Sequence, residues 1–268
     1  MEPVRVAVLG ASGRMGRSLL TLIAARADLE LVGALVSPGS SARGQDAGVA
    51  VGLAPVGVVL DADPGRALAR AQVAIDFSLP VATQGHIAAC VAARVGLVLG
   101  TTGLSPAAQA ALTAATAQIP VLAAANMSLG IQVLLSLVRE AAARLPPDYD
   151  IEILETHHRH KRDTPSGTAL ALGEAAAQGR GIDHETAAIY DRAVNGRPRE
   201  AGSIGYAVLR AGDTIGEHSV WFAGLGERLE LAHTATDRAT FARGALEAAR
   251  FLAGRAAGRY QLADVLAG

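Results

Sequence analysis

The chain has 268 residues, half of them hydrophobic, and 24 basic and 25 acidic side chains give it a formal net charge of −1. This length allows one large or two smaller domains, and the near-neutral charge argues against a broad basic face for nucleic acid. The one cysteine, Cys90, excludes an intrachain disulfide and fits a reducing compartment. The N-terminus lacks a signal-peptide pattern, and no apolar run reaches the roughly 18 residues of a membrane span. We therefore expect a globular cytoplasmic protein that binds neither nucleic acid nor membranes.

The first half of the sequence alternates short apolar runs with helical patterns. The valine-rich run VRVAVLG, at residues 4–10, is typical of a strand that is buried on both faces. The runs that predict strands are residues 4–10, 29–37, 72–77, 96–100 and 120–125, and the patterns that predict helices are residues 13–28, 80–94 and 105–117. This alternation predicts an α/β domain with a parallel sheet, covered by helices on both faces, up to about residue 126.

The pattern changes after this point. Residues 129–144 predict a long helix, residues 149–158 a strand and residues 166–179 another helix. Three strands then follow closely, at residues 203–212, 218–226 and 228–236, and glycine-containing turns join them. This spacing predicts a mostly antiparallel sheet in a smaller α+β domain, and an amphipathic helix at residues 237–255 closes the pattern.

A glycine-rich turn joins the first predicted strand to the first predicted helix. Gly10, Gly13 and Gly16 have the spacing G-x-x-G-x-x-G, with Ser12 where the commoner dinucleotide fingerprint has its second glycine. Such glycines allow a tight turn, approach of a pyrophosphate and close helix packing, while the helix N-terminus offers free N–H groups. The position between a strand and a helix favours a nucleotide site, and the alternative is a glycine turn without a ligand.

The end of the second predicted strand bears on which dinucleotide is bound. Val36 and Ser37 stand where an acidic residue usually holds the ribose 2′-hydroxyl. Without that carboxylate nothing repels a 2′-phosphate, which Ser37 would hydrogen-bond and Arg43 would neutralise, unless both side chains simply face solvent. The sequence therefore predicts a nicotinamide dinucleotide, leaves NADH or NADPH open and favours NADPH.

Two later turns also follow strand ends, GTTG at residues 100–103 and AANMSLG at residues 124–130. Ligands of open parallel sheets bind outside the carboxyl ends of the strands. Thr101, Thr102 and Asn126 are therefore candidate contacts to the nicotinamide half of the cofactor, and loop capping is the alternative role for each.

Six consecutive basic-type side chains lie in the middle of ETHHRHKRDTPSGTAL, residues 155–170. A metal site needs ligands that face one point, whereas His157 and His158 point to opposite faces of a strand. A solvated charged loop is a second interpretation. The third is an anion site with acid–base capacity, because histidine exchanges protons near neutral pH and a Ser-Gly-Thr helix start offers hydroxyls and N–H groups to a carboxylate. The third interpretation suits a small dianionic substrate.

Lys161 sharpens this interpretation, because it is the only lysine in a chain with 23 arginines. Arginine does not release a proton at usable pH, whereas lysine does. A chemical requirement for lysine at this position explains the exception.

Together the motifs resemble one family closely, the 4-hydroxy-tetrahydrodipicolinate reductases, also called dihydrodipicolinate reductases, of bacterial lysine and diaminopimelate synthesis. GASGRMG, DFS at residues 76–78, GTTG, AANMSLG, ETHHRHKRDTPSGTAL and GEHSVWFAGLGERLELAH occur in the order of that family, over nearly the whole chain. The His-His-x-x-Lys block with its Pro-Ser-Gly-Thr turn is highly specific, whereas the glycine loop is not.

The resemblance implies the domain organisation and the activity. Residues 1–126 and 235–268 would form a Rossmann-like dinucleotide-binding domain, and residues 127–234 a substrate-binding domain whose sheet builds a homotetramer. The family reduces a cyclic imine dicarboxylate with NADH or NADPH, and we expect no metal.

The resemblance also implies roles for individual residues. His157 is similar to the general acid/base and Lys161 to the proton donor, while His158, Ser166, Gly167 and Thr168 are similar to substrate contacts. The positions similar to cofactor contacts are Gly10, Ala11, Ser12, Gly13, Arg14, Met15, Phe77, Gly100, Thr101, Thr102, Ala124, Ala125, Asn126 and Met127.

The chain departs from the family pattern at Val36 and Ser37, where many members have an acidic residue followed by arginine, and at Thr164, where alanine is frequent. Two other classes of protein remain as alternatives. A semialdehyde or sugar dehydrogenase is one, although the first needs a catalytic cysteine and Cys90 lies in a helical run that is typical of a core. A dinucleotide-sensing regulator is the other, although it has no need for Lys161 and both histidines.

Overall fold

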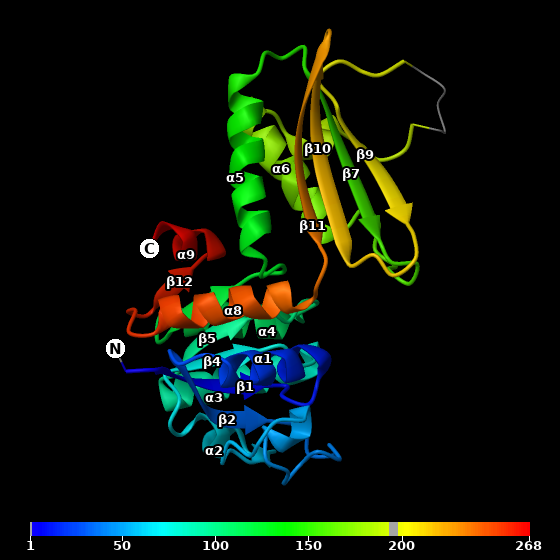
Figure 1. The fold of residues 1–268 in the computed structure, drawn as a ribbon. Helices are drawn as coiled ribbons and strands as arrows, with labels where there is room; N and C mark the ends of the chain where they lie inside the picture. Colours follow the sequence, from blue (N-terminus) through cyan, green and yellow to red (C-terminus); the bar gives the residue numbers. More distant parts are fainter. Residues whose placement is uncertain (1, 193–197) are drawn as a thin grey trace. The chain divides into compact units, whose positions relative to one another are not determined.

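The structure is a computed structural model of the chain, and it describes residues 2–192 and 198–268. The chain forms two compact units, the first made of Met1–Ser128 with Ala239–Gly268 and the second of Leu129–Arg238. Each unit has its own sheet and its own helices (Figure 1). The C-terminal segment therefore belongs to the same unit as the N-terminal one.

The first unit contains a seven-stranded sheet in the order β12-β6-β5-β4-β1-β2-β3, in which every pairing is parallel. The predicted Rossmann-like parallel sheet is confirmed. The strands are β1 Val4–Leu9, β2 Leu29–Leu35, β3 Leu60–Asp61, β4 Val73–Asp76, β5 Gly96–Leu99, β6 Pro120–Ala123 and β12 Gly258–Tyr260. β3 and β12 were not predicted, because two or three residues are too short to show an alternating or apolar pattern.

Helices cover both faces of this sheet. They are α1 Arg14–Ala24, α2 Pro64–Leu68, α3 Pro80–Ala93, α4 Pro106–Ala115, α8 Ala239–Leu252 and α9 Leu262–Ala267, with a 3₁₀ turn η1 at Val49–Val51. α1 packs on α8 at one face, and α3 packs on α2 and α4 at the other. The central strands β4 and β5 are buried on both sides, as their apolar runs require, and Cys90 is fully buried in the same core as residues of α2 and α4.

The second unit contains a five-stranded sheet in the order β11-β10-β7-β9-β8. Its elements are α5 Leu129–Arg144, β7 Asp150–His157, α6 Gly167–Arg180, α7 His184–Ala187, β8 Ala188–Ile189, β9 Ile204–Arg210, β10 Gly216–Gly224 and β11 Glu227–Ala235. β10 runs antiparallel to β7 and β11, whereas β9 runs parallel to β7 and β8. The predicted antiparallel hairpin is thus β10 and β11. β9 instead lies across β7 from β10, because α6 provides the crossover that a parallel pair needs.

One face of the second sheet packs on α5 and α6 (Figure 1). Along β7 the residues alternate strictly between buried and partly exposed, and the buried ones are Ile151, Ile153, Glu155 and His157. The apolar pair at the start of β7 joins the core with Phe222 of β10. The charged pair at its end lies on the same face, where a core would be apolar, and marks the place of a site.

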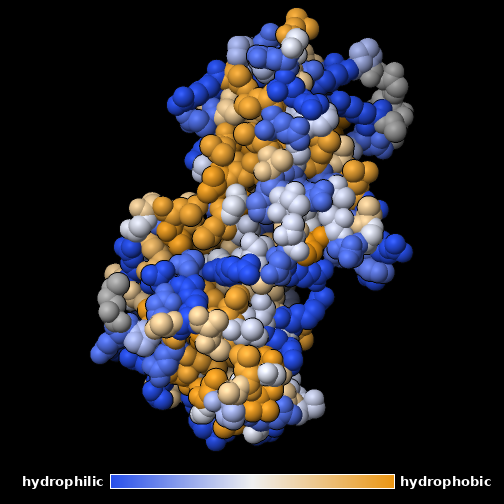
Figure 2. All heavy atoms as spheres, in the orientation of Figure 1, coloured by the Kyte–Doolittle hydropathy of each residue, from blue (hydrophilic) through white to orange (hydrophobic). Residues whose placement is uncertain are grey.

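Apolar side chains also gather on the outside of the second unit. Figure 2 shows them over α5, where Val133 and Leu137 are each close to half exposed. None of the helices within the described ranges has the length and apolar character that crossing a membrane requires.

Gly33 in β2 provides a test of the packing in the first unit. A Cβ atom at this position would lie 1.8 Å from the carbonyl oxygen of Ala67 in α2, so backbone would have to move. We expect Gly33→Ala to lower the free energy of unfolding by about 1–3 kcal/mol or more, as overpacking usually does. The midpoint of thermal unfolding, followed by differential scanning fluorimetry, measures this loss.

Gly85→Ala is the matched control, because a Cβ atom at this exposed position of α3 would meet nothing within 4 Å. Alanine favours a helix over glycine by up to about 1 kcal/mol, so this variant should melt at or above the wild-type temperature. If Gly33→Ala melted together with the wild type, the close approach of β2 and α2 would be wrong.

Candidate active site

The carboxyl ends of four adjacent strands, β1, β4, β5 and β6, meet at one edge of the first sheet. The turns that follow them touch. The hydroxyl of Thr101, after β5, donates to the carbonyl oxygen of Ser78, after β4, at 3.2 Å. A Cβ atom at Gly10, after β1, would lie 3.0 Å from the Cα atom of Ser78. The structure therefore brings the predicted cofactor turns together.

The glycine loop has the backbone that the sequence predicts. Gly10 has a φ of +80°, which favours glycine, and a Cβ atom at Gly16 would lie 2.2 Å from the carbonyl oxygen of Gly10. α1 begins at Arg14 after the N-cap residue Gly13, and no side chain among the described residues caps it. Its first N–H groups are thus free for an anion, and Ser12, Gly13 and Arg14 are exposed. The loop fits a pyrophosphate.

The remaining predicted cofactor residues lie along the same edge. A Cβ atom at Gly100 would lie 2.1 Å from the ring of Phe77, so the ring covers this glycine. Asn126 accepts a hydrogen bond from the N–H of Ser128 at 2.8 Å, which orders the turn after β6. Met15 is half-buried, Thr102 and Ala125 are exposed, Ala124 is half-buried, and Ala11 and Met127 are buried in the core. The last two can offer a ligand little more than their main chain.

The end of β2 faces the glycine loop. The Val36 side chain is buried, so it cannot contact a ribose, whereas Ser37 is exposed. The hydroxyl of Ser40 lies 3.5 Å from that of Ser12. Arg43 is also exposed, and in the described ranges no acidic side chain pairs with it. Hydroxyls and an unpaired guanidinium suit a phosphate group rather than a diol.

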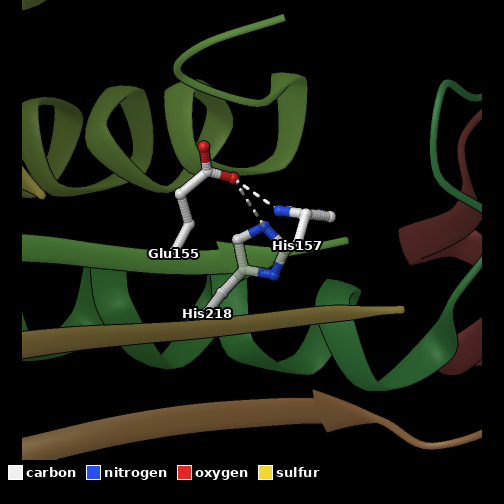
Figure 3. A group of neighbouring side chains, drawn as sticks. All are labelled: Glu155, His157 and His218. Carbon is white, nitrogen blue, oxygen red and sulfur yellow. Dashed lines mark ion pairs between the residues drawn. The ribbon is translucent and has the colours of Figure 1, made fainter. Parts of the chain in front are cut away.

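The second unit holds a compact group of Glu155, His157 and His218 (Figure 3). Oε2 of Glu155 lies 2.9 Å from Nδ1 of His157 and 3.9 Å from Nε2 of His218. Two of the residues come from β7 and the third from β10, where Glu155 and His218 are register partners. The two imidazole rings meet edge to face, with centroids 5.1 Å apart.

Glu155 is a buried carboxylate that remains charged. Its Oε1 accepts hydrogen bonds from the N–H of Ser166 and from the Arg210 guanidinium, each at 3.1 Å. Burial alone would raise the pKa of Glu155, but the contacts with His157, Ser166 and Arg210 outweigh it and lower that pKa to about 2. A negative charge is therefore fixed beside the imidazoles.

His218 is a neutral neighbour. Burial, followed by the electrostatic effect of the neighbouring His157 imidazole, lowers the pKa of His218 to about 4. Its Nε2 lies 3.1 Å from the hydroxyl of Ser166, which also accepts from the N–H of Ala169 and caps α6. Ser166 thus ties the start of α6 to the histidine pair, and its buried hydroxyl is already engaged.

The predicted turn after β7 presents the other candidate residues. Nζ of Lys161 lies 2.8 Å from Oδ2 of Asp163, and the N–H of Lys161 donates to the carbonyl oxygen of His158 at 3.1 Å. Arg210 donates to the carbonyl oxygens of Lys161 and Asp163 at 3.3 and 2.6 Å. The guanidinium that holds Glu155 therefore also holds the backbone that carries Lys161.

His158, Gly167 and Thr168 flank this turn. His158 is half-buried, and its pKa is lowered by burial and then by the positive charge of Arg238. Gly167 is exposed as the first residue of α6, where a Cβ atom would meet nothing within 4 Å, and Thr168 is half-buried. The N-terminus of α6 thus faces open space at Gly167, and the Lys161 side chain in the turn before it is about one-fifth exposed.

The group of Glu155, His157 and His218 has the donors of a metal site, with ligand atoms within 4.8 Å of one another. A cation would have to separate Oε2 of Glu155 from Nδ1 of His157, which are already in contact at 2.9 Å. Arg210 already balances the carboxylate charge. This arrangement favours proton exchange over metal binding.

Three residues around His157 were not predicted from the sequence: Glu155, Arg210 and His218. A signal for the first was present, since Glu155 and His157 are two apart in a strand and must share its buried face. The others come from β9 and β10, and only the fold shows that both strands flank β7.

Comparisons with known proteins agree over both units. A family described as dihydrodipicolinate reductase, N-terminus, matches residues 4–127, and one described as dihydrodipicolinate reductase, C-terminus, matches residues 130–266. The chain is 50% identical over 263 residues to a 4-hydroxy-tetrahydrodipicolinate reductase of Thiobacillus denitrificans, with 98% of each chain covered. It is 46% identical over 266 residues to the protein of that name in Nitrosomonas europaea, with 99% of each covered.

A solved structure shares the fold. It is a dipicolinate-bound dihydrodipicolinate reductase from Paenisporosarcina sp. TG-14, with a TM-score of 0.75, 22% identity and 97% of each chain covered. The family matches and the full-length relatives, together with the glycine loop and the histidine–lysine turn, show that the chain belongs to the dihydrodipicolinate reductase family.

Proposed function

We propose that this protein reduces 4-hydroxy-tetrahydrodipicolinate to tetrahydrodipicolinate with NADH or NADPH, in diaminopimelate and lysine biosynthesis. The family membership supports the reaction, and the names of the full-length relatives support the substrate. The observation that carries the proposal is the buried Glu155–His157 pair beside the only lysine of the chain. We place the enzyme in the reducing cytoplasm, which suits its single buried thiol.

In the first unit the main-chain N–H groups of Ser12, Arg14 and Met15 hold the cofactor pyrophosphate, in the loop that runs from Gly10 to the start of α1. Phe77, Gly100, Thr101 and Thr102 line the nicotinamide half, together with the turn from Ala124 to Met127. The bound cofactor supplies a hydride to the substrate. Because these turns are ordered by hydrogen bonds within the unit, they orient the ligand without rearranging.

In the second unit Gly167 and Thr168 bind one substrate carboxylate at the N-terminus of α6, where the helix dipole favours an anion. His158 and the cationic turn hold the dianion. Hydride addition leaves the product one proton short, and His157 and Lys161 supply that proton. Lys161 lies against Asp163, which draws its ammonium group away from full solvent and fixes its position.

A semialdehyde dehydrogenase would need a reactive cysteine as its nucleophile, and Cys90 does not meet this need. Cys90 is fully buried, and burial followed by the negative charge of Asp76 raises the pKa of its thiol to about 12. A thiol in this state is neither accessible nor ionised. The regulator without chemistry has no use for a buried carboxylate that is paired with a histidine.

We also propose that the protein is a homotetramer that assembles through the second sheet. The face of this sheet turned away from α5 and α6 carries Leu209, which is 59% exposed, and Trp221, over whose ring Arg228 lies at 3.9 Å. Static light scattering should give about four times the 27.3 kDa of one chain. Replacing Leu209 by Arg should lower the measured mass, and a monomeric wild type would contradict assembly.

Turnover with both reduced cofactors tests the reaction and its cofactor preference together. We expect NADPH to be used at least as well as NADH, because Val36 replaces the acid that would repel a 2′-phosphate. Arg43→Ala should raise the KM for NADPH and leave the KM for NADH unchanged, since NADH has no phosphate there. Arg259→Ala, at an exposed position of the opposite sheet edge, is the control. A preference for NADH of about a hundredfold would contradict the proposal for Arg43.

Lys161→Arg tests proton donation. If Lys161 donates a proton, arginine cannot replace it, because the pKa of a guanidinium is above about 12. We expect kcat to fall about 10²-fold or more, as is usual for loss of a general acid, while KM for the dicarboxylate changes less and cofactor affinity is unchanged. Steady-state kinetics that separate kcat from KM measure this. Near-normal kcat would make Lys161 an electrostatic clamp, and Arg259→Lys controls for the substitution.

A further inference from the structure

The two ring nitrogens of His157 have different surroundings. Nδ1 faces the carboxylate of Glu155 at 2.9 Å, deep in the sheet face (Figure 3). Nε2 points to Gly216 of β10, where a Cβ atom would lie only 3.0 Å away. One nitrogen is thus held by a charge, and the other faces a place where the chain has no side chain.

The two oxygens of the Glu155 carboxylate have different partners. Its Oε1 is used by two donors, the N–H of Ser166 and the guanidinium of Arg210. Its Oε2 is left for the imidazoles, and the His157 nitrogen is nearer by 1.0 Å than that of His218 (3.9 minus 2.9 Å). Because Oε1 is anchored from α6 and β9, Oε2 is not free to turn away from His157.

Burying a carboxylate this deeply costs free energy of folding, and this cost points to a role for the charge. The Glu155 side chain is 1% exposed, and an apolar residue would complete this core face without any desolvation cost. An imidazole next to a fixed carboxylate keeps its proton on the nitrogen that faces the carboxylate, so the other nitrogen becomes the one that exchanges protons.

We propose that Glu155 is a positioning residue that holds the proton of neutral His157 on Nδ1, and that Gly216 keeps Nε2 open for proton exchange. This inference rests on the proposed reductase function. The reacting form of His157 is the imidazolium, with a second proton on Nε2 that comes from solvent. For each hydride that the substrate accepts, this Nε2–H bond breaks and its proton goes to the reduced substrate. His157 then returns to its neutral Nδ1–H form, and solvent water returns a proton to Nε2.

Glu155→Gln is the first test, because the amide keeps the size of the side chain and an oxygen for Ser166 and Arg210. Its amide group also offers Nδ1 a donor, which favours the wrong tautomer of His157. We expect kcat to fall about 10–100-fold, as is usual when the partner that orients a histidine is lost. KM for both substrates should change less than about threefold.

The matched control is Glu217→Gln, the same substitution at a residue that has no proposed role in catalysis. Glu217 is exposed on β10, between the buried Gly216 and His218. It should keep wild-type kcat and KM. Glu155→Asp retains the charge and should recover part of the loss, whereas a purely structural role would make the shorter Asp at least as harmful as Gln.

Imidazole nitrogen shifts of ¹⁵N-histidine-labelled protein report the tautomer directly, and His157→Gln assigns the signal. Wild-type His157 should carry its proton on Nδ1, and Glu155→Gln should shift it toward Nε2. The wild-type measurement does not depend on turnover, so it tests the inference even if the proposed reaction fails. A wild-type His157 protonated on Nε2 alone would overturn the role of Glu155.

Gly216→Ala tests the open side of the ring. The added methyl group would press on Nε2 and leave the Glu155 contact in place. We expect kcat to fall at least about tenfold with a wild-type tautomer in the nitrogen spectrum. Wild-type kcat in both Gly216→Ala and Glu155→Gln would overturn the inference, whereas lack of turnover by the wild-type enzyme would refute the proposed function alone.

Discussion

The second unit depends on one buried negative charge. A carboxylate with 1% of its side chain exposed is tolerated only when hydrogen bonds and opposite charge replace the water it has lost. The partners of Glu155 come from four elements: His157 from β7, Ser166 from the start of α6, Arg210 from β9 and His218 from β10. Satisfying this charge therefore fixes the strand order around β7 and the start of α6 at the same time. The contacts that satisfy the buried charge of Glu155 are therefore also the contacts that arrange the residues of the site.

In the first unit the corresponding constraint is close approach of backbone. Gly16 lets α1 lie on the turn after β1, and Gly100 lets the Phe77 ring lie on the turn after β5, because a Cβ atom at either place would lie about 2 Å from its neighbour. These approaches bring the strand-end turns into contact with one another. In the proposed function the first unit would bind its ligand mainly through backbone groups, and the second unit through charged side chains.

The sequence predicted what depends on neighbours along the chain. The buried parallel strands, the glycine loop and the long helices were predictable because apolar runs, glycine spacing and helical periodicity are local properties. β3, β8 and β12 were not, since two or three residues carry no period. The parallel placement of β9 was not predictable either, because the close spacing of the last three strands favoured a simple antiparallel order. Arg210 acts on a residue 55 positions away, and no local pattern announces such a contact.

The second unit has arginine at position 210 and lysine at position 161, and the surroundings of the two cations differ. Arg210 supplies five donors in a rigid plane and stays charged at any usable pH, which suits a residue that must satisfy Glu155 and two backbone carbonyls at once. A lysine there would lose donors and would be able to lose its charge, leaving the carboxylate uncompensated. At position 161 the demands are reversed. There the cation pairs with Asp163 and is partly exposed, in the turn that precedes α6. A group that can give up a proton is useful in that place, whereas a guanidinium is inert. A chain that otherwise uses arginine throughout therefore has its single lysine at the position where the proposed proton transfer, rather than charge alone, would need one.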